Sequence, residues 1–367
     1  MFTVEHLPAD LATPCLVVDA ETVRANIAGM ADYCREHRLR LRPHTKTHKS
    51  RFVARLQLAA GAAGLTVAKA GEAEVMAEVC DDVLIAYPAI DPPRTRKLAQ
   101  LARKRTVRVG IDSVEAAEAL SAAAGEQHAE LGILVDLDLG FGRTGVQTAA
   151  EAANLAHAID RLSGVRLDGV MFFPGHITGS PEQQRPHIDR AAERLEEVLN
   201  VWQRDWIAAR IVSGGSTPTA FQSHHFKLLT EIRPGTYVFN GVNELYGGYA
   251  TLDDCAARVL CTVVSTAVSG KVVLDGGSKV FTSDRCGPRP ESGHGLIVEY
   301  PEAKIVRLSE EHAEVDVSMC KRRPKVGQRV SVVPNHICPC VNLLDTFWWW
   351  ENGSAVAIRV DARGQLS

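Results

Sequence analysis

The chain has 367 residues, of which 46% are hydrophobic and 23% charged. This length exceeds that of an average single domain, so we expect a large domain followed by a second one. Lysine and arginine total 41 against 44 aspartates and glutamates, and such a balance provides no field that would attract nucleic acid or an anionic membrane. We therefore expect a small-molecule substrate, with neither nucleic acid nor a membrane as a partner.

The expected compartment is the cytoplasm. The first residues, MFTVEHLPADLATPCL, lack a basic segment followed by an apolar run. No stretch approaches the roughly 20 apolar residues that cross a bilayer as a helix. The 9 cysteines are an odd number scattered along the chain, which favours reduced thiols over a disulfide framework.

Short apolar runs alternate with segments of helical period between residues 12 and 240, beginning with CLVVD and then ETVRANIAGMADYCREH. The further strand candidates are LRLRP, GLTVA, VLIAY, VRVGI, LGILVDLD, LDGVMFF and ARIVSGG. About eight such units close a TIM-type (β/α)8 barrel, which is the fold we predict here. A doubly wound open sheet would give the same alternation, but the GxGxxG turn typical of dinucleotide binding does not follow the first run.

A second, mostly β domain is predicted for residues 241–367. Helical periods end there, and short strands such as KVVLDGG and QRVSVVP are separated by Gly, Pro and Ser turns. We assign residues 1–11 to the same domain because chain termini are often close together.

A turn rich in cations follows the strand candidate LRLRP. It holds His44, Lys46, His48 and Lys49, at the end of a barrel strand where the chemistry of such barrels lies. Two interpretations remain open from these residues alone. The turn is either a solvated basic loop, or it activates a lysine, since neighbouring cations make a lysine amine nucleophilic.

Two downstream segments favour a phosphate-bearing cofactor. VSGGSTPT, residues 212–219, places small residues after a strand, and EIRPGTY follows. Such loops expose backbone N–H groups and hydroxyls to a phosphate, although ordinary turns and phosphosugar loops have the same composition. Together with a lysine at a strand end, they suggest a cofactor bound covalently to that lysine.

A candidate metal site lies near the C-terminus, where His336, Cys338 and Cys340 follow an apolar strand. On extended chain, His-x-Cys spacing directs both side chains to one side, and imidazole with thiolate suits zinc. A structural zinc needs four ligands, so an open two-ligand site and a closed structural site are both possible. A buried cysteine beside a hydrogen-bonded histidine is the alternative without a metal.

These motifs resemble those of a known family. The chain contains PxLVVDxxxxxxNI, RPHTKTHK, VDxDxGxxRTGV, FPGH, SGGSTPT, RPGTYVF, LDGGSKxxxxD, SEEH and PNHICP. They occur in the order seen in the D-threonine aldolase and D-serine dehydratase family, along nearly the whole chain. That family belongs to the alanine-racemase-like, fold-type III pyridoxal-phosphate enzymes, which have an α/β barrel followed by a β domain. By analogy, the resemblance implies a D-amino acid substrate and a homodimer.

The resemblance also implies roles for individual residues. Lys46 would carry pyridoxal 5'-phosphate, and Arg143 would lie near the cofactor's phenolic oxygen or the substrate carboxylate. Arg233, with Tyr237 beside it, would face the pyridine nitrogen; an arginine keeps its proton, which weakens the ring as an electron sink. The residues implied to surround the phosphate are Ser213, Gly214, Gly215, Ser216 and Thr217. His176 is implied as a general acid or base, or as a hydrogen-bonding residue only.

The metal pair bears on the reaction. His336-x-Cys338 resembles the dehydratase branch of the family, whereas the aldolase branch more typically has His-x-Asp. Thiolate favours zinc, with manganese or magnesium as alternatives.

We expect a pyridoxal-phosphate- and metal-dependent lyase that dehydrates D-serine or D-threonine-like substrates to a 2-oxo acid and ammonia. The alternative is retro-aldol cleavage to glycine and an aldehyde, with His48 or His176 as base. A racemase or a non-catalytic cofactor-binding protein is more remote, because neither needs the metal pair.

Overall fold

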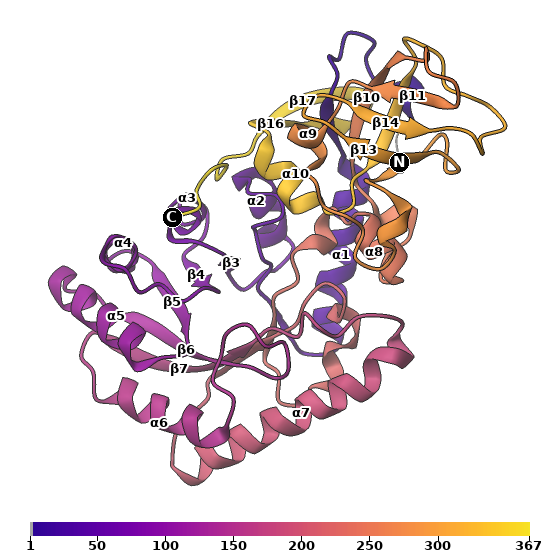
Figure 1. Cartoon of the computed structure of the whole chain (residues 1–367). Helices are drawn as coiled ribbons and strands as arrows, with labels where there is room; N and C mark the ends of the chain where they lie inside the picture. Colours follow the sequence, from indigo (N-terminus) through magenta and orange to yellow (C-terminus); the bar gives the residue numbers. More distant parts are fainter. Residues whose placement is uncertain (1–2) are drawn as a thin grey trace. The chain divides into compact units, whose positions relative to one another are not determined.

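The computed structural model describes residues 3–367, which form two compact units. The first, here called the barrel unit, comprises Ala28–Lys46, Arg51–Gly235 and Gly364–Ser367. The second, the β unit, comprises the chain up to Ile27, Thr47–Ser50 and Thr236–Arg363. Each is described by itself (Figure 1).

The barrel unit is built on a parallel sheet. In the described residues it has 8 strands in the order β2-β9-β8-β7-β6-β5-β4-β3. Their bounds are β2 (Arg40–Leu41), β3 (Leu65–Val67), β4 (Asp82–Ile85), β5 (Thr106–Ile111), β6 (Leu131–Leu137), β7 (Val165–Phe172), β8 (Ile211–Gly214) and β9 (Glu231–Ile232). A parallel bridge between His44 and Thr66 joins the two ends of this order. The predicted TIM-type barrel is confirmed.

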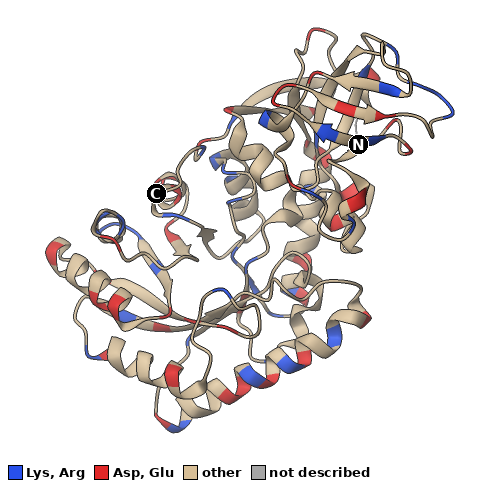
Figure 2. Cartoon of the chain, viewed as in Figure 1, with Lys and Arg blue, Asp and Glu red and all other residues tan. Residues whose placement is uncertain are grey.

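Helices alternate with these strands. They are α1 (Ala20–Glu36), whose first part belongs to the β unit, α2 (Arg51–Ala59), α3 (Ala70–Met76), α4 (Pro92–Ala102), α5 (Val114–Gln127), α6 (Ala149–Asp160) and α7 (Pro181–Arg204), with the 3-10 turn η2 (Ala220–His225). Helix α7 begins at a capping box formed by Ser180 and Gln183, which satisfies N–H groups of its first turn. It buries Ile188, Leu195 and Trp202, at spacings that place them on one face. In Figure 2, basic and acidic residues are interspersed along the ribbon of α7.

The β unit contains a sheet of 9 strands in the described residues, with the path β13-β14-β11-β10-β1-β16-β17, and β15 paired with β10 and β12. The bounds are β1 (Cys15–Asp19), β10 (Ala257–Ser265), β11 (Lys271–Leu274), β12 (Leu296–Ile297), β13 (Lys304–Leu308), β14 (Ala313–Asp316), β15 (Arg329–Val333), β16 (Thr346–Glu351) and β17 (Ser354–Arg359). Its helices are α8 (Val242–Gly247), α9 (Ser278–Phe281) and α10 (Ile337–Leu343), with η1 (Val4–His6), η3 (Thr236–Val238), η4 (Leu252–Asp254) and η5 (Pro290–Ser292). A mostly β C-terminal region is thus confirmed.

The first strand lies in a different sheet from the one predicted. CLVVD, expected to begin the barrel, is β1 and pairs antiparallel with β10 and parallel with β16 in the β unit. All of its residues are buried, and such a run fits a buried barrel strand and a central sheet strand equally well. The barrel gains β9 instead, which has only 2 residues. The compact units accordingly place residues up to Ile27 with the β sheet, not with the barrel.

No helix of residues 3–367 combines the length and the apolar character that crossing a membrane requires.

Candidate active site

Lys46 lies in the turn that follows β2 in the barrel unit. The turn is fixed on both sides, since the His44 N–H donates to the Pro234 carbonyl at 2.9 Å and the Thr45 N–H to the Thr66 carbonyl at 2.8 Å. The Lys46 N–H faces His44 Nδ1 at 3.4 Å. Its Nζ lies 5.9 Å from the centre of the Phe173 ring, within cation–π range. The sequence thus places the lysine amine at the carboxyl edge of the barrel.

The predicted phosphate loop is a buried turn at the end of β8. Gly215 has φ +82°, a conformation in which successive N–H groups can face an anion. A Cβ at Gly214 would lie 2.3 Å from the Phe172 ring, so only glycine fits there. The Ser216 N–H and hydroxyl lie 3.3 and 3.1 Å from the Thr219 hydroxyl. Thr217 follows and is half-buried. These groups fit a phosphate, although that role stays a prediction.

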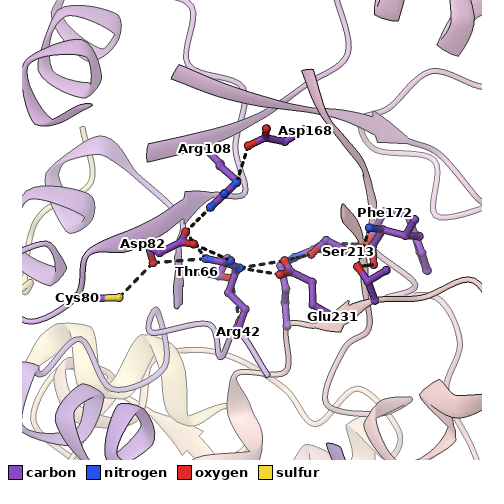
Figure 3. Close-up of polar contacts among 12 residues, drawn as sticks. Arg42, Thr66, Cys80, Asp82, Arg108, Asp168, Phe172, Ser213 and Glu231 are labelled. Carbon is purple, nitrogen blue, oxygen red and sulfur yellow. Dashed lines mark hydrogen bonds and ion pairs between the residues drawn. The ribbon is translucent and has the colours of Figure 1, made fainter. Parts of the chain in front are cut away.

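Ser213 lies between Glu231 (Figure 3) and Arg233, and its hydroxyl contacts both. The Ser213 hydroxyl donates to Glu231 Oε1 at 2.6 Å and accepts from Arg233 Nη1 at 2.6 Å. Arg233 Nη2 donates to the Phe172 carbonyl at 2.7 Å. Burial lowers the pKa of Arg233 to about 10, with Glu231 opposing the shift, so the guanidinium keeps its charge at neutral pH. Ser213 therefore orients Arg233, a role that the sequence had not suggested.

A chain of alternating charges continues from this point through the barrel interior (Figure 3). Arg42 Nε lies 3.0 Å from both oxygens of Glu231, and Arg42 Nη1 lies 2.7 Å from Asp82 Oδ1. Arg108 contacts Asp82 and also donates to Asp168 Oδ2 at 2.7 Å. Burial raises the pKa of Asp82, but Arg42 and Arg108 outweigh it and hold that pKa below its usual value. Sequence reasoning missed this network, whose only signal was charged residues inside apolar strands.

Two phenylalanine rings lie close to other predicted residues of the barrel unit. The Arg143 guanidinium lies 4.7 Å from the centre of the Phe141 ring and 5.1 Å from that of Phe173. His176 stacks on Phe141 at 6.3 Å. Since Lys46 also lies near Phe173, and the two ring centres are 5.2 Å apart, the three predicted residues all lie close to this pair of rings. Neither phenylalanine was predicted, although both stand in the motifs that supplied Arg143 and His176.

The His176 imidazole is exposed, and it lies over a glycine. A Cβ built at Gly140, whose φ is +122°, would lie 3.2 Å from His176 Nε2. Partial removal of the ring from water, followed by His187, lowers the pKa of His176, with Asp138 opposing them. The imidazole is therefore neutral at neutral pH, as a general base must be.

The predicted metal pair lies in the β unit, at the start of α10. His336 is the N-cap residue, in extended conformation, and Cys338 belongs to the first turn of the helix. The expectation of extended chain at both positions is therefore wrong for Cys338, yet Cys338 is near enough to His336 to raise the pKa of its imidazole. Cys338 Sγ lies 3.3 Å from the Thr47 hydroxyl and 4.0 Å from that of Thr236.

The surroundings of this pair are anionic. His336 Nδ1 lies 3.3 Å from Asp284 Oδ2. Burial lowers the pKa of His336, but the hydrogen bond and charge of Cys338, with Glu244 and Asp284, raise it to about 9. Burial raises the pKa of Glu244 to about 7, and its Oε2 atom has no hydrogen-bond partner in the described residues. Groups that stabilise a proton on His336 would also stabilise a divalent cation.

His336 and Cys338 fit a metal ion that keeps open coordination positions. No group of three or more His, Cys, Asp and Glu side chains in residues 3–367 is arranged to hold a metal ion. Cys340 is fully buried and its Sγ faces the Phe281 and His336 carbonyls at 3.3 Å each. Burial raises its pKa further above the usual thiol value, so it is a poor third ligand. Imidazole and thiolate with open positions resemble catalytic rather than structural zinc sites.

His48 and Tyr237 complete the predicted set, and both are buried in the β unit. His48 Nδ1 accepts the Ser50 N–H at 3.1 Å, which assigns the ring proton to Nε2. Its ring centre lies 6.4 Å from that of Phe239. The barrel unit thus holds Lys46, Arg143, His176, Arg233 and residues 213–217, while the β unit holds His48, Tyr237, His336 and Cys338.

The sequences of both units are similar to those of known protein families. Residues 18–242 match the family described as alanine racemase, N-terminal domain, and residues 256–349 match a putative serine dehydratase domain. A D-threonine aldolase from an Arthrobacter species is 31% identical, with 97% of this chain and 94% of the relative covered. The chain belongs to the D-threonine aldolase and D-serine dehydratase family. It is therefore a pyridoxal-phosphate-dependent lyase of fold type III, as the motifs had implied.

A dehydratase is equally similar. The D-threo-3-hydroxyaspartate dehydratase of Delftia sp. (strain HT23) is 32% identical, with 89% of this chain and 91% of the relative covered. A solved cysteine-to-alanine variant of that dehydratase, described as metal-free, has a TM-score of 0.86 at 27% identity over 95% of this chain and 97% of its own. Another solved variant replaces a histidine two positions earlier. The D-threonine aldolase of Filomicrobium marinum has a TM-score of 0.91 at 27% identity over 98% of each chain.

Proposed function

We propose that this enzyme dehydrates D-3-hydroxy amino acids, such as D-serine or substrates like D-threonine, to a 2-oxo acid and ammonia. In this proposal Lys46 carries pyridoxal 5'-phosphate, and His336 and Cys338 hold a divalent metal. Zinc is the metal we propose, with manganese and magnesium as alternatives. The observation that carries the proposal is the placement of the His336 imidazole and the Cys338 thiol together at the start of α10, with Asp284 beside His336. The paired histidine and cysteine variants of the Delftia dehydratase support it.

The two groups would supply complementary chemistry when bound: the cofactor accepts electrons from the substrate Cα, and the metal acts as a Lewis acid on the β-hydroxyl. The Lys46 amine then takes the α-proton, and Arg143 binds the substrate carboxylate. Arg233 keeps its own proton, so a cofactor ring whose nitrogen it faced would be a weaker electron sink. Help for the leaving hydroxyl therefore matters more, and Lewis-acid assistance contributes several kcal/mol to such a step.

The proposal gives the lysine and the metal pair roles in the same reaction. Lys46 and Thr47 are consecutive residues, and the Thr47 hydroxyl lies 3.3 Å from Cys338 Sγ. This continuity of the chain supports a shared role, and a carrier of the cofactor without catalytic function would need no such metal pair.

Retro-aldol cleavage to glycine and an aldehyde is the second candidate, favoured by the similarity to the two D-threonine aldolases. It requires a base for the β-hydroxyl proton. His176 suits this role because its pKa is lowered and its ring is exposed. The other predicted base, His48, has its Nδ1 occupied by the Ser50 N–H.

Product identity separates the two candidates. The purified, zinc-supplemented holoenzyme is incubated with D-serine and, separately, with D-threonine, and the products are identified by mass spectrometry. We expect pyruvate from D-serine and 2-oxobutyrate from D-threonine, each with ammonia. Glycine and acetaldehyde from D-threonine would mean that the cysteine ligand does not dictate elimination, and the aldolase assignment would replace ours. Lys46→Ala serves as the inactive control.

We further propose that the enzyme is cytoplasmic, as expected from its sequence, and that it is a homodimer, by analogy with its fold class. Light scattering coupled to size-exclusion chromatography tests the dimer, and a monomeric mass at catalytic concentration would contradict it.

A further inference from the structure

We propose that Asp284 is a positioning residue for the metal ligand His336. The inference rests on the proposed function in one respect, because it takes His336 to be a ligand. Asp284 Oδ2 lies 3.3 Å from His336 Nδ1, and Asp284 is the last residue of the LDGGSKxxxxD motif, for which the proposed reaction supplies no role.

The contact decides which imidazole nitrogen is available. A carboxylate this close to Nδ1 favours the ring proton on that nitrogen, which leaves the lone pair of Nε2 for a cation. Metal-ligating histidines commonly have a carboxylate beside their second nitrogen, which fixes the ring orientation and raises the basicity of the ligand. Asp284 therefore selects Nε2 of His336 as the donor atom.

The backbone of Asp284 is held in place by groups next to the metal pair. The Asn335 side-chain amide donates to the Asp284 carbonyl at 3.0 Å and to the Gly293 carbonyl at 2.8 Å. Asn335 is buried and directly precedes His336. The same short segment that carries the ligand thus also holds the residue that orients it.

The segment before Asp284 is built with a costly backbone conformation. Thr282 has φ +65°, which is rare for a β-branched residue and persists only where the surroundings impose it. Its hydroxyl accepts the Asp284 N–H at 3.2 Å. Asp284 is therefore fixed at its N–H by Thr282 and at its carbonyl by Asn335, which limits how far its carboxylate can drift from His336.

Asp284 is assigned to positioning and not to coordination. Its carboxylate engages the nitrogen of His336 that a metal on Nε2 would not use, and no three-ligand group exists in residues 3–367. A lost ligand changes the coordination of the metal, whereas a lost orienting group weakens affinity by about 10–100-fold and keeps the coordination.

The test measures zinc affinity of the cofactor-loaded protein by competition with a chromophoric chelator. Wild type is compared with Asp284→Ala, Asp284→Asn, Cys338→Ala and the control Asp253→Asn, which removes an exposed carboxylate of the same unit. We expect Asp284→Ala to weaken zinc binding about 10–100-fold, with a smaller loss for Asp284→Asn, which keeps a polar oxygen next to Nδ1 but loses the charge. Asp253→Asn should bind zinc like the wild type.

The cobalt-substituted proteins report the coordination directly. We expect the visible cobalt spectrum of Asp284→Ala to keep the shape of the wild-type spectrum, while Cys338→Ala loses the thiolate charge-transfer band. Zinc affinity of Asp284→Ala equal to that of wild type would overturn the inference and leave the proposed function standing. A cobalt spectrum altered in Asp284→Ala would overturn it by making Asp284 a ligand. Equal zinc affinities of wild type and Cys338→Ala would instead overturn the metal assignment itself.

Discussion

The two units solve the problem of buried polar groups in different ways. In the barrel unit, charged side chains neutralise one another: Arg42 contacts Glu231 and Asp82 with almost no exposure of its own. In the β unit, His336 and Cys338 have anionic neighbours, and Glu244 Oε2 is buried without a hydrogen-bond partner in the described residues. The barrel network is therefore complete without a ligand, whereas the β-unit cluster would be completed by a cation.

The buried charge network of the barrel unit therefore acts as a fixed frame for its fold. The His336 and Cys338 pair of the β unit, in contrast, can change its protonation and its metal occupancy. Buried ion pairs are costly to assemble, and removing one partner leaves an uncompensated charge in a medium of low dielectric constant. The barrel should therefore keep its geometry whether or not the metal is bound. The β-unit pair should change its chemistry with pH and with metal supply, because metal ligands must be deprotonated.

The largest effect should follow from removing the barrel-unit lysine. Lys46→Ala deletes both the attachment of the cofactor and the base for the α-proton, and loss of general-base catalysis alone costs about 10²–10⁴-fold in kcat. Borohydride reduction followed by peptide mass analysis should find the cofactor on the Lys46 peptide of wild type and not in the variant. The control is Lys49→Ala, whose amine contacts Asn342 at 2.8 Å; cofactor found on Lys49 would contradict the assignment.

Next in size is the loss of the buried barrel arginine. Arg42→Met leaves Glu231 and Asp82 without their main cation, and we expect the free energy of unfolding to fall by about 3–5 kcal/mol. Chemical denaturation measures the change. The exposed pair of Arg35 and Asp32 provides the comparison, since Arg35→Ala should cost between about 0 and 1 kcal/mol. Equal effects of the two substitutions would show that the barrel network is not a stabilising frame.

The pH dependence of cleavage should reveal His176. Its pKa is lowered, so the neutral imidazole persists below the ordinary histidine pKa of about 6.5 and is lost only as the pH falls through the lowered value. Any cleavage of D-threonine should therefore decline on the acid side below about pH 6.5. His176→Gln should reduce it about 10²-fold and remove that acid limb. Dehydration, which uses Lys46, should change much less; an equal loss in both reactions would assign His176 to a shared step.

The smallest effect concerns the phosphate loop. Gly215→Ala forces a side chain into a left-handed conformation at a cost of about 1–2 kcal/mol, and we expect cofactor affinity to fall about tenfold. Fluorescence titration of the apoenzyme with pyridoxal phosphate measures this. Gly29→Ala is the matched control, because Gly29 lies in α1 with open space around its Cβ position. Unchanged affinity in Gly215→Ala would separate this loop from the cofactor.

The sequence predicted the barrel because helical and strand periods alternate over most of it. It could not assign CLVVD to the correct sheet, because a strand buried on both faces has the same apolar pattern in a barrel and in the centre of an open sheet. It also could not reveal β9, whose two residues are too few to show a period. The His336 and Cys338 pair is local in sequence and was visible. Arg42 and Glu231 are 189 positions apart, so their pairing depends on strand order, which periodicity does not reveal. The contact of Asp284 with His336 depends on tertiary structure in the same way.

The most direct test of these assignments removes the metal and measures catalytic activity and cofactor binding together. The zinc-loaded holoenzyme is treated with a chelator, and dehydration of D-serine is followed together with the visible absorption of the bound cofactor. We predict that dehydration is lost while the cofactor absorption stays, and that added zinc restores the activity. Loss of both signals, or of neither, would contradict a division of labour between Lys46 in the barrel unit and the His336 and Cys338 pair in the β unit.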